Sequence, residues 1–124
     1  MARAQTRSKR KISGGRYHSA RSKRKSELAR QPTLTKLGER KTKKLRTLGG
    51  NQKRILLSVK EINVTDKKGK TQKTEIVNVL ENPSNPNLVR RNILTKGAIV
   101  ETKLGKAKIT SRPGQEDSVN GTLV

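Results

Sequence analysis

The sequence predicts an all-β fold: a small closed or partly closed β-barrel that follows a basic, extended N-terminal arm. From about Leu34 onward, short segments rich in Ile, Leu and Val recur at a spacing of roughly 8–12 residues with Gly, Pro or Asn between them, as in small barrels and sandwiches. Before Leu34 the few large apolar residues show neither a helical nor a strand period. Closing such a sheet would remove edges that a thin core cannot protect.

Charge divides the 124-residue chain unevenly. Lys and Arg total 31 against 9 acids, a formal net charge of +22. Residues 1–60 carry 20 basic and 2 acidic residues, whereas residues 61–124 carry 11 and 7. We therefore interpret residues 1–33 as a basic, largely extended arm that orders on binding, and residues 34–124 as the small barrel domain. A solvated tail without a function is the other interpretation of the arm.

Alternation and turn residues place the strands of the barrel domain. Strands are predicted at residues 41–48, 53–60, 62–64, 74–80, 88–94, 98–102, 107–110 and 119–124. Turns are predicted at residues 49–51, 66–69, 82–87, 96–97, 103–106 and 112–114. A period of two places Ile55, Leu57 and Val59 on one face. In residues 74–80, apolar side chains at both even and odd positions predict partial burial of both faces.

Several functional classes are excluded by what the sequence lacks. There is no Cys, so disulfides and thiolate metal sites are absent, and one His with scattered acids cannot close a metal site. His18 has no acid nearby to orient it as a general base. No apolar run approaches the roughly 18–20 residues of a membrane span, and no signal peptide is visible. We expect a cytoplasmic protein without a cofactor, a catalytic residue or a small-molecule substrate.

The arm has the residues of a polyanion-binding segment. Lys supplies a mobile point charge, Arg makes paired hydrogen bonds to phosphate, and glycine lets a backbone approach closely. A phosphate or base contact is one role for His18, and a solvated side chain is the other. The candidate RNA-binding residues of the arm are Arg3, Arg7, Lys9, Arg10, Lys11, Gly14, Gly15, Arg16, Tyr17, His18, Arg21, Lys23, Arg24, Lys25 and Arg30.

A second candidate set lies in the barrel domain and is expected to form one basic patch around the turn at residues 49–51. Its members are Arg40, Lys43, Lys44, Arg46, Lys53 and Arg54, to which Arg90, Arg91, Lys96 and Arg112 are added. Taken singly, each of these residues can also be interpreted as an ordinary solubilising residue. Phe and Trp are absent and Tyr17 stands alone, so a base-stacking sheet is not expected. Recognition is expected to use phosphates, sugars and RNA shape.

Three stretches resemble a known family. They run from Ser8-Lys-Arg-Lys-Ile-Ser-Gly-Gly-Arg to Arg30, from Gly38 to Asn51, and from Glu81 to Ala98 with a continuation through Ile109-Thr-Ser-Arg-Pro-Gly114. The chain is similar there to small-subunit ribosomal protein number eight of archaea and eukaryotes, which is unrelated to the bacterial protein of that number. Its short length resembles archaeal members. One departure is Ala4, where archaeal members often have an aromatic residue.

The resemblance implies a structural protein of the small ribosomal subunit, with a β-barrel-like core and a basic extension along ribosomal RNA. The implied partners are small-subunit ribosomal RNA and neighbouring ribosomal proteins. Charge alone leaves a nucleoid-associated DNA-binding protein as the alternative. An RNA-modifying or translation-factor enzyme is a third hypothesis, but no nucleophile, base or nucleotide loop supports it.

Overall fold

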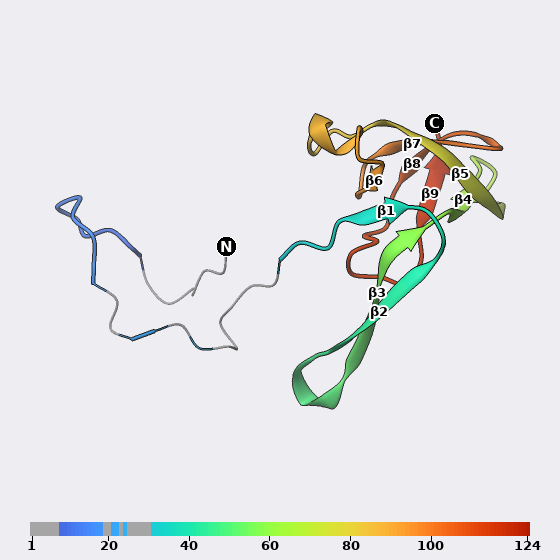
Figure 1. Cartoon of the computed structure of the whole chain (residues 1–124). Coiled ribbons are helices and arrows are strands. Elements are labelled where there is room, and N and C mark those ends of the chain that lie inside the picture. Colours follow the sequence, from blue (N-terminus) through green and yellow to red (C-terminus); the bar gives the residue numbers. More distant parts are fainter. Residues whose placement is uncertain (1–7, 19–20, 23, 25–30) are drawn as a thin grey trace. The chain divides into compact units, whose positions relative to one another are not determined.

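The computed structural model describes residues 8–18, 21–22, 24 and 31–124. It divides the chain into two compact units, Met1–Pro32 and Thr33–Val124 (Figure 1). The second unit contains β1 (Thr35–Leu37), β2 (Lys41–Arg46), β3 (Gln52–Val59), β4 (Glu61–Thr65), β5 (Thr71–Glu81), β6 (Ile93–Leu94), β7 (Ile99–Thr102), β8 (Gly105–Ile109) and β9 (Asn120–Leu123). Two short 3-10 turns, η2 (Leu48–Gly50) and η3 (Pro86–Leu88), interrupt them. The predicted all-β class is confirmed.

Five strands close a barrel in the order β4-β5-β7-β8-β9, which confirms the predicted closure. All neighbours are antiparallel except β4 and β9, which pair in parallel and join the first strand of the barrel to the last. The Asn63 N–H donates to the Val119 carbonyl at 2.9 Å, and the Asn63 side chain donates to that of Asn120 at 3.0 Å. These bonds hold β9, the last strand of the chain, against β4, the first strand of the barrel.

The remaining strands form a second sheet in the order β2-β3-β1-β6. The sequence did not separate this sheet from the barrel. β2 and β3 form a long hairpin that extends away from the barrel strands (Figure 1). At its other end β3 pairs in parallel with β1, which in turn pairs with the short β6. The hairpin is thus anchored at one end and free at its turn.

The core is aliphatic and small, as the composition requires. Its main cluster combines Leu56, Val59, Ile62, Val64, Ile76, Val79, Leu94, Ala98, Val100, Ala107, Ile109 and Val119. Leu56 and Val59 come from β3 and Leu94 from β6, so the second sheet shares the core of the barrel. Among the described residues, no helix is long or apolar enough to cross a membrane.

The predicted apolar face of residues 53–60 is wrong at one position. Ile55 and Val59 are buried, but Leu57 is exposed and its neighbour Leu56 is fully buried. The register shows the cause: Lys41 pairs with Ser58 and Thr42 with Leu56, which leaves Leu57 as the extra residue of a bulge. A bulge reverses the alternation of the strand beyond it.

A comparable irregularity explains β5, in which Ile76 and Val79 are both buried although they lie three residues apart. The pairing with β7 shifts between Ile76 and Asn78, so Val77 is displaced and exposed. Apolar residues at even and odd positions therefore do reach the core, as predicted, whereas Val77 does not.

The strand predicted at residues 88–94 is mostly wrong, because only Ile93 and Leu94 pair in β6. Pro86 starts the 3-10 turn η3, and the Asn85 side chain caps it by accepting from the Asn87 N–H at 3.0 Å. Asn92 then adopts a positive φ of 50°, which no extended strand contains. Local capping at Asn85 and Pro86 overrides the β-forming side chains that follow.

The first unit contains a tight turn where the sequence predicted extended chain. Arg10 and Arg16 form an antiparallel bridge, and the Lys11 N–H donates to the Gly15 carbonyl at 2.7 Å. Gly14 has a φ of 82°, which an L-residue adopts only with strain, so glycine permits the reversal. The arm thus reverses its direction within residues 9–17.

Gly121 is where barrel closure leaves no room for a side chain. It pairs with Val64 of β4 on one side and Ile109 of β8 on the other. A Cβ there would lie 2.9 Å from the Lys108 carbonyl oxygen and 3.1 Å from Ile62 Cδ1. We predict that Gly121→Ala lowers the free energy of unfolding by about 1–3 kcal/mol, the usual cost of overpacking, as measured by urea denaturation. Thr122→Ala, at the exposed neighbouring position, is the control. Equal stabilities of the two variants would contradict the tight closure.

Candidate nucleic-acid interface

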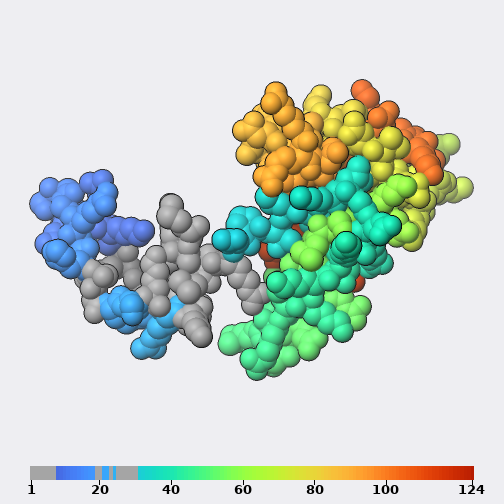
Figure 2. Space-filling view, viewed as in Figure 1, coloured from blue at the N-terminus to red at the C-terminus, as the bar shows by residue number. Residues whose placement is uncertain are grey.

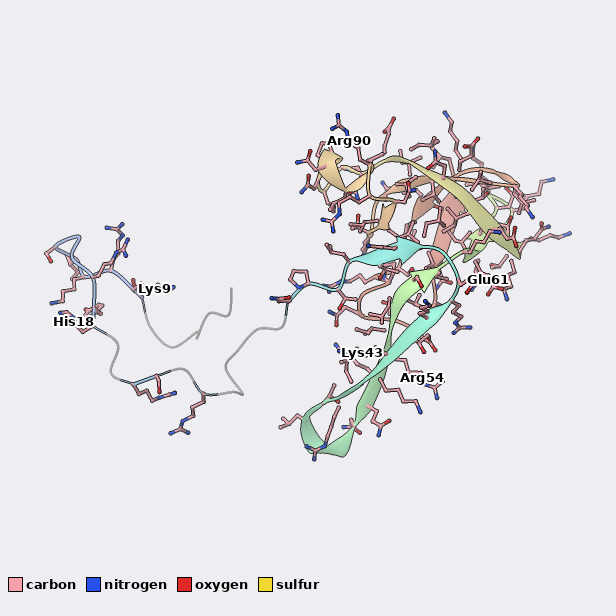
Figure 3. The ribbon with its side chains drawn as sticks, in the orientation of Figure 1. Lys9, His18, Lys43, Arg54, Glu61 and Arg90 are labelled. Carbon is pink, nitrogen blue, oxygen red and sulfur yellow. The ribbon has the colours of Figure 1, made fainter. Side chains whose placement is uncertain are left out.

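The β2–β3 hairpin brings together five of the predicted binding residues, and a sixth, Arg40, directly precedes β2. Its register sets Lys44 opposite Arg54, Lys43 opposite Ile55, and Leu45 opposite Lys53. Because side chains alternate between faces, Lys44 and Arg54 lie on one face while Lys43 and Lys53 lie on the other. Lys43 and Arg54 extend from the hairpin in Figure 3. Both faces of this two-stranded ribbon are therefore basic.

Almost no negative charge balances the hairpin. Residues 40–60 contain no Asp or Glu. Within the described ranges, Asp117 is the acid that contacts it, at 3.1 Å from Arg40 and 4.0 Å from Arg54. No ion pair is present for Lys43 or Lys44 within the described part of the chain. Like charges on adjacent strands repel, so this surface favours an anionic partner.

The loop after β8 braces the hairpin. The Leu56 N–H donates to the Pro113 carbonyl at 3.1 Å, so the loop lies along β3. Lys53 donates to the Gln115 side chain, and Arg40 donates to the Asp117 side chain at 3.1 Å. Arg112 is exposed at the start of this loop. The structure thus brings Arg112 into the neighbourhood of the hairpin, as the sequence led us to expect.

Arg90 and Arg91 lie elsewhere. They are exposed in the turn between η3 and β6, and β6 is at the opposite edge of the sheet from β2. Figure 3 shows Arg90 at the far end of the second unit from Lys43. Lys96 is exposed in the turn after β6. Arg90 and Arg91 therefore do not belong to the basic patch of the hairpin.

Several cations on the barrel exterior are paired with acids. Glu75 binds Lys103 at 2.7 Å and Lys60 at 3.6 Å, and Glu61 binds Lys73 at 2.8 Å. The hydrogen bond from Lys103, followed by the charges of Lys103 and Lys60, lowers the pKa of Glu75 below its ordinary value of 4.5. Such exposed pairs add little stability, but they cancel charge on this face.

In the first unit the turn at residues 9–17 presents its cations around a glycine pair. The Arg10 guanidinium donates to the Gly14 carbonyl at 3.1 Å, which folds that side chain over the turn. The Lys11 ammonium lies 5.7 Å from the centre of the Tyr17 ring, within the range of a cation–π contact. The remaining described candidates are exposed, namely Lys9, Gly15, Arg16, His18, Arg21 and Arg24. Arg3, Arg7, Lys23, Lys25 and Arg30 lie outside the described residues.

The sequence reasoning missed two cations that the fold places beside the candidate set. Lys41 occupies β2 with Lys43, and exposed Lys36 occupies β1 between β3 and β6. Alternation in residues 41–46 could have revealed Lys41. No sequence pattern could have placed Lys36 beside the hairpin, because its three-residue strand is too short to show an alternation of polar and apolar residues. Within the described ranges, no cluster of three or more potential metal-ligating side chains occurs.

Comparison with known proteins identifies the chain's relatives. Residues 4–124 match the family described as Ribosomal protein S8e. A protein of Methanobrevibacter smithii named small ribosomal subunit protein eS8 is 51% identical over 100% of both chains. Proteins of the same name from Nanoarchaeum equitans and Methanocorpusculum labreanum are 56% and 50% identical, and each alignment covers 97% of this chain with 95% and 97% of the relative. The resemblance inferred from the sequence is confirmed, and this chain belongs to the ribosomal protein S8e family.

Proposed function

We propose that this chain is a structural constituent of the small ribosomal subunit that binds ribosomal RNA through the phosphate backbone, using the basic arm and the β2–β3 hairpin. The observation that carries the proposal is the separation of charge within the fold. Acids pair with cations on the barrel exterior, whereas residues 41–59, which form the hairpin, contain cations and no acid. A surface of Lys and Arg in such excess on a projecting ribbon suits the dense negative charge of folded RNA.

The proposed mechanism is charge neutralisation with a fixed register. Lys44 and Arg54 are held opposite each other by the strand ladder, so their charges are placed without ordering a loop. Preorganised contacts of this kind lose less conformational entropy on binding than contacts from flexible chain. The arm adds cations that order against RNA, which gives affinity at an entropic cost.

Family membership bears on the other hypotheses. The family is one of ribosomal structural proteins, so the prediction that the chain is not an enzyme is confirmed. No feature of the described residues favours the nucleoid-associated alternative. The relatives are named as proteins of the small ribosomal subunit. We extend that assignment to a cytoplasmic ribosome, with small-subunit ribosomal RNA and neighbouring ribosomal proteins as partners.

The arm should contribute a large share of the affinity without supporting the fold. We predict that deleting residues 1–32 leaves the strand signal in circular dichroism intact, because the buried core residues of the described part of the chain all lie after Thr33. Binding to protein-free small-subunit ribosomal RNA, measured by filter retention, should weaken most at low salt, where cation–phosphate contacts dominate. Unchanged affinity would contradict the role of the arm in binding. An unfolded truncation would contradict the prediction that the second unit folds without the arm.

Each hairpin cation that contacts a phosphate should contribute separately to the salt dependence of RNA affinity. We predict that Lys43→Ala with Lys44→Ala reduces the slope of log affinity against log salt by about 0.7–0.9 for each phosphate that the variant no longer neutralises, taking DNA slopes as a guide. The control is Lys106→Ala with Lys108→Ala on β8, which removes the same charge where Glu101 faces Lys106 across the ladder. Equal slopes for the two double variants would show that only net charge matters and would contradict the hairpin interface.

A further inference from the structure

The tip of the β2–β3 hairpin holds an apolar side chain in an unusual place. Leu48 is 96% exposed, although it is a large apolar residue within a folded unit. Exposing a leucine forgoes the free energy that burial of its side chain would contribute. Figure 2 shows the hairpin projecting from the second unit, so the tip stands away from the core that could cover it. Its environment is also basic, since Lys44, Arg46 and Lys53 precede and follow the turn.

The turn is built to hold this side chain outward. The Thr47 N–H donates to the Asn51 carbonyl at 2.7 Å, and the Asn51 side chain donates to the Leu48 carbonyl at 3.3 Å. Gly49 and Gly50 both have positive φ values, 73° and 77°, which L-residues adopt only with strain. The two glycines therefore let the chain reverse directly after Leu48. Bonds on both sides of the turn preorganise the tip.

Two other apolar residues in turns can be compared with Leu48 in their exposure and in the charges near them. Leu104 also sits in a hairpin turn between lysines, but it is 48% exposed, and its neighbour Lys103 is paired with Glu75. Ile12, in contrast, is 109% exposed; it follows Lys11 and lies two residues before a Gly-Gly pair, and Leu48 lies two residues after Arg46 and directly before such a pair. The two fully exposed apolar residues thus each lie shortly before a Gly-Gly pair, whereas the partly covered Leu104 follows a lysine that is paired with an acid.

Resting on the proposed function, we infer that Leu48 is an apolar wedge that contacts an unpaired or unstacked base of RNA while the surrounding cations hold the adjacent phosphates. RNA offers both partners within one short distance, an anionic backbone and the apolar face of a base. Single apolar side chains of this type are inserted at base steps by proteins that bind nucleic acids. A protein partner is disfavoured because one side chain at a narrow tip falls far short of the area that a stable protein interface buries.

The experiment uses the full chain and two RNA probes, a continuous duplex and the same duplex with one unpaired 2-aminopurine nucleotide. Affinity is measured at several salt concentrations, and 2-aminopurine fluorescence reports the stacking of the unpaired base. The unaltered chain should bind the bulged RNA more tightly than the duplex and should change the fluorescence. Leu48→Ser should weaken binding to the bulged RNA by about tenfold, abolish the fluorescence change and leave duplex affinity and salt slope unaltered.

Two further variants separate the wedge from general effects. Leu48→Met, which keeps an apolar side chain of similar size, should behave as the unaltered chain. Leu104→Ser removes a leucine from another lysine-flanked turn and should also have no effect. The inference is overturned if the unaltered chain shows no preference for the bulge, if Leu48→Ser matches it on both probes, or if Leu104→Ser loses the preference equally. Failure of the unaltered chain to bind either RNA would instead overturn the proposed function.

Discussion

Mutual repulsion among 31 Lys and Arg side chains opposes folding of this chain, and the structure depends on where its 9 acids lie. Glu61 and Glu75 lie on the barrel exterior, where they pair with Lys73, Lys60 and Lys103. Asp117 is used differently, since it holds Arg40 and Arg54 and thereby ties the loop after β8 to the base of the hairpin. The barrel can therefore close around a small aliphatic core, and the cations of the hairpin are left with few acids near them.

Much of the fold was predictable because strand alternation and turn residues are local signals. The hairpin turns at Gly49-Gly50 and at residues 103–106, and the buried Ile62 and Val64, follow directly from the sequence. Leu57 did not, because a bulge depends on how β3 pairs with β2 and not on the order of side chains. The second sheet was equally hidden, since its order β2-β3-β1-β6 arises from pairings between residues distant in the chain.

The candidate site was also predictable only in part. Which residue types bind was readable from composition, and the hairpin group needed only a correctly placed turn to bring its cations together. Which cations share a surface was not readable. Arg90 lies on the opposite edge of the sheet from β2 because residues 85–92 form a capped turn, and Lys103 lies next to Glu75 because β5 and β7 pair. Distinguishing a balanced cation from an unbalanced one requires these tertiary neighbours.

In the proposed function, unbalanced cations, and not cations in general, face RNA. The most direct measurement is lysine acetylation of the full chain, read by mass spectrometry with and without protein-free small-subunit ribosomal RNA. We expect RNA to protect Lys43 and Lys44 on the hairpin and Lys9 and Lys11 in the arm. Lys60, Lys73 and Lys103 on the barrel should stay as reactive as they are in the free protein. Equal protection of all these lysines, or stronger protection on the barrel, would contradict this expectation.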